Sequence, residues 1–157
     1  MKGDRGVLEH LNKILKNELT AINQYFLHYR MLKDWGLERS AAHEREESID
    51  EMKHADQLME RILFLDGLPA MQTLGKLNIG ENVKEVYECD LKLEMAGLPD
   101  LKKAIAHSEK VADYVSRDLF RRILDNEEEH VDWLETQLDL IDKTGIEIYM
   151  NAQIEED

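Results

Sequence analysis

The sequence is poor in residues that cross-link a chain or interrupt its helices. It has one cysteine, Cys89, among 157 residues, together with two prolines, eight glycines and 6% aromatic residues. A single cysteine cannot form a disulfide within the chain or supply a cysteine-based zinc site, so a reducing compartment is the simple inference. We expect Cys89 to be an ordinary small side chain in or near the core.

Positive charge and long apolar runs are also scarce. The formal net charge is −14 at pH 7, which argues against a nucleic-acid partner because nucleic acids select basic surfaces. The same charge suits a protein that attracts cations. No segment reaches the about 18 uninterrupted apolar residues of a membrane span, and the first residues lack the apolar stretch of a signal peptide. We therefore expect no membrane contact and a cytoplasmic location.

What the sequence does contain is helical periodicity. Apolar residues recur three and four positions apart in four long stretches, which predict helices over 5–34, 36–65, 82–111 and 114–142. Residues 66–81 hold three glycines and a proline and are too long for a tight turn, so they predict a crossover connection. With a short fifth helix over 146–154, the prediction is one all-α domain over 1–157, built as a four-helix bundle.

One group of ligand-type residues occurs twice in register. The unit is a glutamate followed 33 residues later by Glu-x-x-His, and each histidine is followed two positions on by an aspartate. Glu-x-x-His places its two polar groups on one face of a helix. The doubled unit therefore predicts two halves of one di-metal site, with Glu18, Glu51 and His54 in the first half and Glu94, Glu127 and His130 in the second.

The glutamates of both copies take places in the helical stripes where hydrophobic residues are expected. An ionised carboxylate buried without a partner is costly, so the core must contain a compensating charge. Four glutamates and two neutral histidines would be balanced by two divalent cations. A carboxylate and imidazole ligand set without thiolate points to iron, manganese or zinc.

Each member of the repeat has a simpler interpretation when it is taken alone. Glu51 or Glu127 could be the solvated face of an acidic helix, and a lone His54 or His130 is more often a core-edge histidine bonded to a neighbour. The doubled spacing and the inner position of all six groups favour the di-metal site. A Glu from each of two helices and Glu-x-x-His from two others is the arrangement of ferritin-like di-iron bundles.

Five segments of the chain are informative together, namely NELTAINQYFLH (17–28), SIDEMKHAD (48–56), RILFLDGLP (61–69), LGKLNIG (74–80) and HVDWLE (130–135). These segments resemble bacterioferritins, and the resemblance covers essentially the whole chain. It implies a homo-oligomeric, haem-containing shell of 24 subunits built of dimers, which oxidises ferrous iron with O2 or H2O2 and stores it as a ferric mineral. A small ferredoxin-type partner would return electrons for iron release.

The resemblance also implies roles for the repeated residues. Glu51 and Glu127 would bridge two irons, while one Glu and one His would complete each iron, namely Glu18 with His54 and Glu94 with His130. Tyr25, on the stripe of Glu18, would either hydrogen-bond the site or supply an electron. An aromatic residue at such a position is more often plain core.

Met52 follows Glu51 by one residue and so points about 100° away from the di-metal side of an ideal helix. The resemblance implies that Met52 and its twin from a second subunit bind the iron of a b-type haem across a two-fold dimer interface. The walls of that haem pocket would include Leu19, Ile22, Asn23, Phe26 and Trp35.

Two adjacent positions depart from the family pattern. Arg45-Glu46 stands where Tyr-His is common, with the tyrosine beside the haem and the histidine on an additional iron that faces the cavity. Glu46 and the nearby Asp50 are the candidates for that cavity-side iron in this chain. Glu46 offers a carboxylate where the family has an imidazole, so the ligand set of this iron site differs from the family pattern.

Three other functions fit parts of the sequence. A small di-iron oxidase or peroxidase of the rubrerythrin kind usually brings a module with four cysteine ligands, and the single cysteine counts against it. An acidic bundle without enzyme activity would leave six polar core residues without a metal. A DNA-coating mini-ferritin conflicts with the net charge and with a ligand set inside one bundle.

Overall fold

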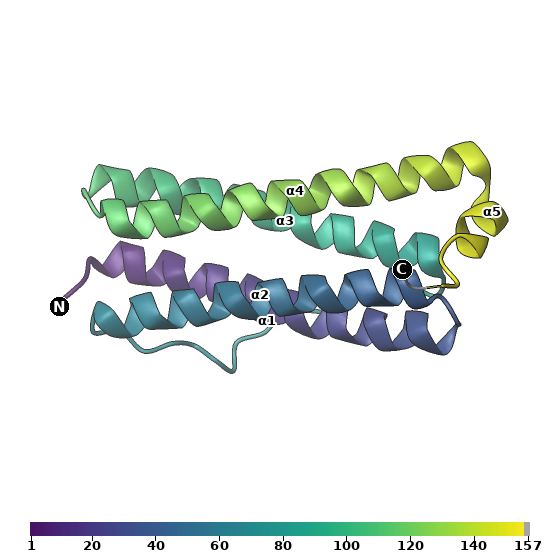
Figure 1. The fold of residues 1–157 in the computed structure, drawn as a ribbon. Coiled ribbons are helices and arrows are strands. Elements are labelled where there is room, and N and C mark those ends of the chain that lie inside the picture. The colour runs from purple at the N-terminus through teal and green to yellow at the C-terminus, as the bar shows by residue number, and fades with distance from the viewer. Residues whose placement is uncertain (156–157) are drawn as a thin grey trace.

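A computed structural model describes residues 1–155 of the chain as a bundle of helices (Figure 1). Its long helices are α1 (Arg5–Asp34), α2 (Glu38–Phe64), α3 (Val83–Lys110) and α4 (Tyr114–Thr144), and α5 (Ile146–Asn151) is a short helix at the C-terminal end. The predicted all-α class is confirmed, and the predicted limits of the four long helices differ from these by two residues or fewer. Among the described residues, no helix is both long and apolar enough to cross a membrane.

Side-chain caps define where three of the long helices begin. Asp4, Asn82 and Asp113 precede α1, α3 and α4, and each accepts a hydrogen bond from a backbone N–H in the first turn. Such caps satisfy N–H groups that have no partner inside the helix. Asp113 also accepts a hydrogen bond of 2.9 Å from the guanidinium of Arg61, which ties the end of α2 to the start of α4.

The four long helices form two antiparallel hairpins, α1 with α2 and α3 with α4, joined by a long crossover (Figure 1). The crossover runs back along the bundle, so α2 and α3 point in the same direction. Polar side chains of α1 hold it in place. The contacts are Asn12 with Leu68 and Ala70, Thr20 with Gly75, Gln24 with Asn78, and His28 with Gly80.

Gly80 lets the crossover pass very close to the first turn of α3. A Cβ atom at this position would lie 2.3 Å from the backbone nitrogen of Val86, and the backbone of a helix cannot move aside to relieve such a clash. The absence of a side chain therefore allows the N–H of Gly80 to reach His28, 3.0 Å away in the core.

The hydrophobic core is divided into two clusters along the bundle. One contains Leu11, Leu58 and Phe120, and the other contains Tyr87 and Leu134. The layer between them is filled instead by buried polar and charged side chains. Burial of so many polar groups in one layer is costly unless they pair with one another or with an ion, and this layer is where the predicted ligands lie.

Candidate metal centre

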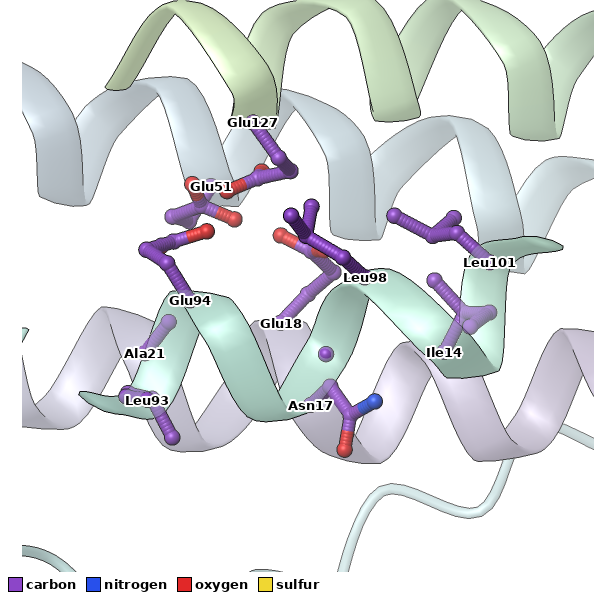
Figure 2. Close-up of a pocket in the computed structure, with 11 residues that line it drawn as sticks. Ile14, Asn17, Glu18, Ala21, Glu51, Leu93, Glu94, Leu98, Leu101 and Glu127 are labelled. Carbon is purple, nitrogen blue, oxygen red and sulfur yellow. The ribbon is translucent and has the colours of Figure 1, made fainter. Parts of the chain in front are cut away.

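The six ligand-type side chains of the sequence repeat meet in the polar layer at the middle of the bundle. Each of the four long helices contributes at least one of them, and the glutamates converge from four sides (Figure 2). All six are buried, with at most 9% of any residue exposed. They are Glu18 from α1, Glu51 and His54 from α2, Glu94 from α3, and Glu127 and His130 from α4.

One half of the centre is arranged around His54. Its Nδ1 lies 3.1 Å from Glu127 Oε1, 3.3 Å from Glu18 Oε2 and 3.4 Å from Glu51 Oε2. One ligand atom from each of these four residues lies within 4.8 Å of the others. A single metal ion can therefore reach all four side chains.

The other half is arranged around His130. Its Nδ1 lies 3.3 Å from Glu94 Oε1, and ligand atoms of Glu51, Glu94, Glu127 and His130 also lie within 4.8 Å of one another. Glu51 and Glu127 belong to both groups. Two carboxylates shared between neighbouring groups are what a pair of bridged cations requires.

The hydrogen bonding of the shared carboxylates tests whether metal ions fit. Both oxygens of Glu51 and both of Glu127 are buried and make no hydrogen bond among the described residues; their contacts with His54 Nδ1, at 3.4 Å from Glu51 and 3.1 Å from Glu127, are ion pairs. Buried carboxylate oxygens without partners are rare because desolvation is then uncompensated. Two divalent cations would supply the missing partners, and the oxygen and imidazole donors suit iron, zinc or manganese.

When no metal is bound, raised pKa values favour the protonated forms of the buried ligand residues. Burial raises the pKa of Glu94 to about 8, and the nearby Glu127 adds to this effect. Burial and Glu51 raise the pKa of Glu127 to about 8. Burial opposes the charged form of both histidines, but their carboxylate neighbours outweigh it, so the pKa of His54 rises to about 10 and that of His130 to about 9.

These shifts predict how the heat stability of the metal-free protein depends on pH. The folded-state pKa of Glu94 and Glu127 lies above the usual 4.5, so their contribution is fully present below that value and is lost as the pH rises toward about 8. The contribution of His54 and His130 is fully present below 6.5 and is lost as the pH rises through about 9 to 10. Both effects have the same sign.

The melting temperature of chelator-treated protein should therefore fall steadily between about pH 5 and pH 9. Protein loaded with Zn2+ should show a much flatter profile over the same range, because bound metal replaces the protons. Thermal unfolding followed by circular dichroism at each pH would measure both curves. A metal-free melting temperature that stays level or rises across this range would contradict the prediction.

Tyr25 lies against the His130 half of the centre. Its hydroxyl donates a hydrogen bond to Glu94 Oε1, and its ring meets the His130 ring edge-on at 5.3 Å between centroids. Burial raises the pKa of Tyr25 well above its usual value, so the phenol keeps its proton. Of the two roles considered from the sequence, the hydrogen bond is present, and the supply of an electron stays a prediction.

A second buried polar group, which the sequence reasoning missed, adjoins the centre. Gly80 donates to Nε2 of His28, so the proton of this ring is on Nδ1, which donates to Asp90 at 2.8 Å. Gln24 also donates to Asp90, at 2.9 Å. Burial and the charge of Asp90 raise the pKa of Glu44 well above its usual value. These surroundings favour the neutral, protonated form of Glu44.

The polar neighbours Tyr25, Glu44 and Glu47 lie on the side of Glu94 and His130. The two halves of the ligand set are related by a shift of 76 residues, from Glu18 to Glu94 and from Glu51 to Glu127. The same shift relates the polar neighbours to apolar residues in the hydrophobic core. The pairs are Tyr25 and Leu101, His28 and Ala104, Glu44 and Phe120, Glu47 and Ile123, and Ile14 and Asp90.

His43 and Glu47 are two further residues that the sequence reasoning missed. The ring of His43 stacks on Trp133 with 3.4 Å between centroids and 15° between planes. Burial and His130 lower the pKa of His43 to about 4, so this imidazole is neutral at pH 7. Glu47 lies four residues before Glu51, and Glu44 seven before it, so extending the inner stripe of α2 backward would have identified both.

The candidates for a cavity-side iron do not come together in the structure. Glu46 is exposed, and Asp50 is half-buried with its Oδ1 3.8 Å from Lys53 Nζ. Neither residue joins a group of close ligand atoms within residues 1–155. Their assignment as iron ligands stays a prediction.

Met52 points away from the metal centre, as its position after Glu51 predicts. It is 43% exposed, whereas Glu51 is 1% exposed. Phe26 and Trp35 on the neighbouring α1 side are likewise exposed, at 43% and 38%. This part of the α1–α2 hairpin thus presents a thioether and aromatic rings at the surface.

Comparison with known proteins agrees with this geometry. Residues 8–144 match the model of the ferritin-like domain family. The chain is 54% identical to the bacterioferritin of Brucella melitensis over 149 residues, which is 95% of this chain and 92% of that protein. It is 50% identical to a bacterioferritin of Mycobacterium tuberculosis, over 95% of this chain and 94% of the relative, and 49% identical to that of Rhodobacter capsulatus, over 92% and 90%. The chain belongs to the ferritin-like family and, within it, to the bacterioferritins.

Proposed function

We propose that this protein stores iron and that its buried centre is a ferroxidase site. The observation that carries the proposal is the set of four buried glutamates and two histidines. The shared carboxylates, Glu51 and Glu127, make no hydrogen bond among the described residues, and each has an ion-pair contact with His54. Such an arrangement is stable only with protons or cations, and a net charge of −14 favours cations around the molecule. The match to bacterioferritins supports iron as the cation.

In this proposal two Fe2+ ions are the substrates of the centre. Glu18 and His54 hold one, Glu94 and His130 hold the other, and the two shared glutamates bridge them. Each Fe2+ loses one electron, and O2 takes both electrons with two protons to give H2O2. With H2O2 as the oxidant, the same two electrons and two protons give two water molecules. Carboxylates that change between bridging and terminal binding accommodate the ferric product.

The proposal includes a shell of 24 subunits built of dimers, with a b-type haem at each two-fold interface. Met52 of two neighbouring subunits would hold the haem, and its exposure on the α1–α2 face fits such a shared ligand. The haem would supply a one-electron carrier for the release of stored iron, and a small ferredoxin-type protein would be the electron donor.

Size-exclusion chromatography with light scattering, followed by iron loading, tests the proposed function. Protein is loaded with Fe2+ without oxygen, O2 is added, and the absorbance of ferric iron is recorded. A shell of about 24 subunits that takes up many more than two irons per chain is the expected result. A small oligomer that stops at two irons per chain would retain the di-iron chemistry and overturn storage in a shell. Failure to oxidise iron faster than buffer alone would overturn the ferroxidase assignment.

A further inference from the structure

We propose a third position for a divalent transition-metal cation, formed by His43 and Glu47 beside the di-metal centre. The inference rests on the proposed function, because it describes how cations reach that centre. The two residues lie one turn apart on α2, and His43 Nε2 is 3.4 Å from Glu47 Oε1. One imidazole nitrogen and one carboxylate form a ligand pair that suits Fe2+, Co2+ or Zn2+.

The imidazole of His43 is held in place with one nitrogen unused. Nε2 is buried and has no hydrogen-bond partner in the described part of the chain. Buried imidazole nitrogens normally find a partner, so an orphaned one that faces a carboxylate fits a metal ligand. The stack on Trp133 fixes the plane of the ring, which keeps Nε2 directed at Glu47.

Glu47 connects this position to the di-metal centre. Its Oε2 lies 3.5 Å from His130 Nδ1, while its Oε1 faces His43. Ligand atoms of His43, Glu47 and His130 all lie within 4.8 Å of one another. His130 therefore belongs both to this group and to the group of Glu94. A cation held by His43 and Glu47 can pass to the centre without losing all of its protein ligands.

The other side of the position opens to a surface pocket. His43 and Trp133 line this pocket together with Arg39, Glu46 and Gln137. A hydrated cation can therefore arrive from solvent, exchange part of its water for His43 and Glu47, and then move inward. When His130 is engaged by an ion in the centre, only two protein ligands remain for the third ion, so we expect it to bind more weakly than the first two.

Binding of Co2+ to the assembled, iron-free protein tests this position. The titration is made in millimolar Mg2+, which fills sites built from oxygen atoms alone and competes poorly for imidazole. A Trp35→Phe background leaves Trp133 as the only tryptophan of the chain. We expect equilibrium dialysis to give three Co2+ per chain, and the third, weakest ion to quench the fluorescence of Trp133.

Variants of the two ligands separate this position from the di-metal centre. His43→Asn and Glu47→Gln should each bind two Co2+ per chain, with the fluorescence change of the third ion lost. His10→Asn is the matched control, because it makes the same chemical change at a histidine of α1 that belongs to none of the groups of close ligand atoms among the described residues. This control should keep all three ions.

The outcomes distinguish the two proposals. Two Co2+ per chain in the parent protein, with no third, would overturn the His43–Glu47 position and leave the ferroxidase proposal intact. A third ion that persists in His43→Asn, or that is lost in His10→Asn, would also overturn the position. Absence of the first two ions in the parent protein would overturn the di-metal centre as well.

Discussion

Replacement of Glu127 by Gln is expected to slow the oxidation of Fe2+ by at least about 100-fold, a loss larger than that for residues that only support a ligand. Glu127 belongs to both halves of the metal centre, and its oxygens make no hydrogen bond among the described residues, although Oε1 lies 3.1 Å from His54 Nδ1. An amide keeps the size of the side chain but cannot supply an anionic bridge. Both Fe2+ positions are therefore weakened by one substitution.

The same variant should be more heat-stable than the parent protein when no metal is bound. At pH 8 the buried Glu127 is held near its pKa of about 8, beside Glu51 and Glu94, and burial of its charge opposes folding. A neutral amide removes this cost. The opposite signs of the two effects, lower activity and higher metal-free stability, distinguish a ligand from a residue that serves packing.

Stopped-flow absorbance at two Fe2+ per chain and thermal unfolding in chelator measure these effects. Glu128→Gln is the matched control, because it makes the same chemical change one residue further along α4 on an exposed side chain. The control should leave both quantities unchanged. A Glu127→Gln protein that oxidises Fe2+ at the parental rate would refute the assignment of Glu127 as a bridge.

Replacement of Met52 by Leu is expected to abolish haem binding, from one haem for each two chains to none. Leucine preserves the volume and the apolar character of the exposed side chain but has no sulfur atom to bind haem iron. Because Met52 points away from the buried centre, Fe2+ oxidation and shell assembly should be retained. Only the release of stored iron by an added reductase should become slower.

Haem content by pyridine haemochrome absorbance, measured with iron uptake on the same sample, tests this expectation. Met95→Leu is the matched control, since Met95 is 52% exposed on α3 and lies in the other hairpin. The control should bind haem normally. Full haem content in the Met52→Leu protein would refute the proposed ligation, while parallel loss of haem and of the shell would show that Met52 serves assembly instead.

The helices were predictable because their limits are encoded locally. The inner stripes of apolar residues continue for many turns, and capping residues such as Asp4 and Asn82 occur at their starts. The short α5 was predicted over 146–154 and ends at Asn151. Beyond its end, Gln153 hydrogen-bonds with the start of α2, at Arg39 and Ser40, and such tertiary contacts cannot be predicted from periodicity.

The meeting of the six ligand-type side chains was also predictable, since a repeat of polar residues on inner stripes carries information that single residues do not. His43, Glu44 and Asp90 were missed in the sequence because none of them belongs to such a repeat. They occur once, and in a chain with 34 acidic residues a single Glu or Asp on a helix is usually solvated. Glu44 could still have been identified from the inner stripe of α2, whereas the burial of Asp90 depends on its packing against His28 and Gln24 of α1 in the folded bundle.

The one-sided polar surroundings of the centre bear on the order of events in catalysis. The repeat gives the two halves the same ligands, but Tyr25 contacts Glu94 and Glu47 contacts His130 in one half, whereas the residues 76 positions further on, Leu101 and Ile123, belong to the hydrophobic core. Equal ligands in unequal surroundings have unequal affinities and redox potentials. We therefore expect the two halves to bind metal one after the other, with two resolved steps in a metal titration. Although the ligand set is duplicated, one iron would then be oxidised more readily than the other.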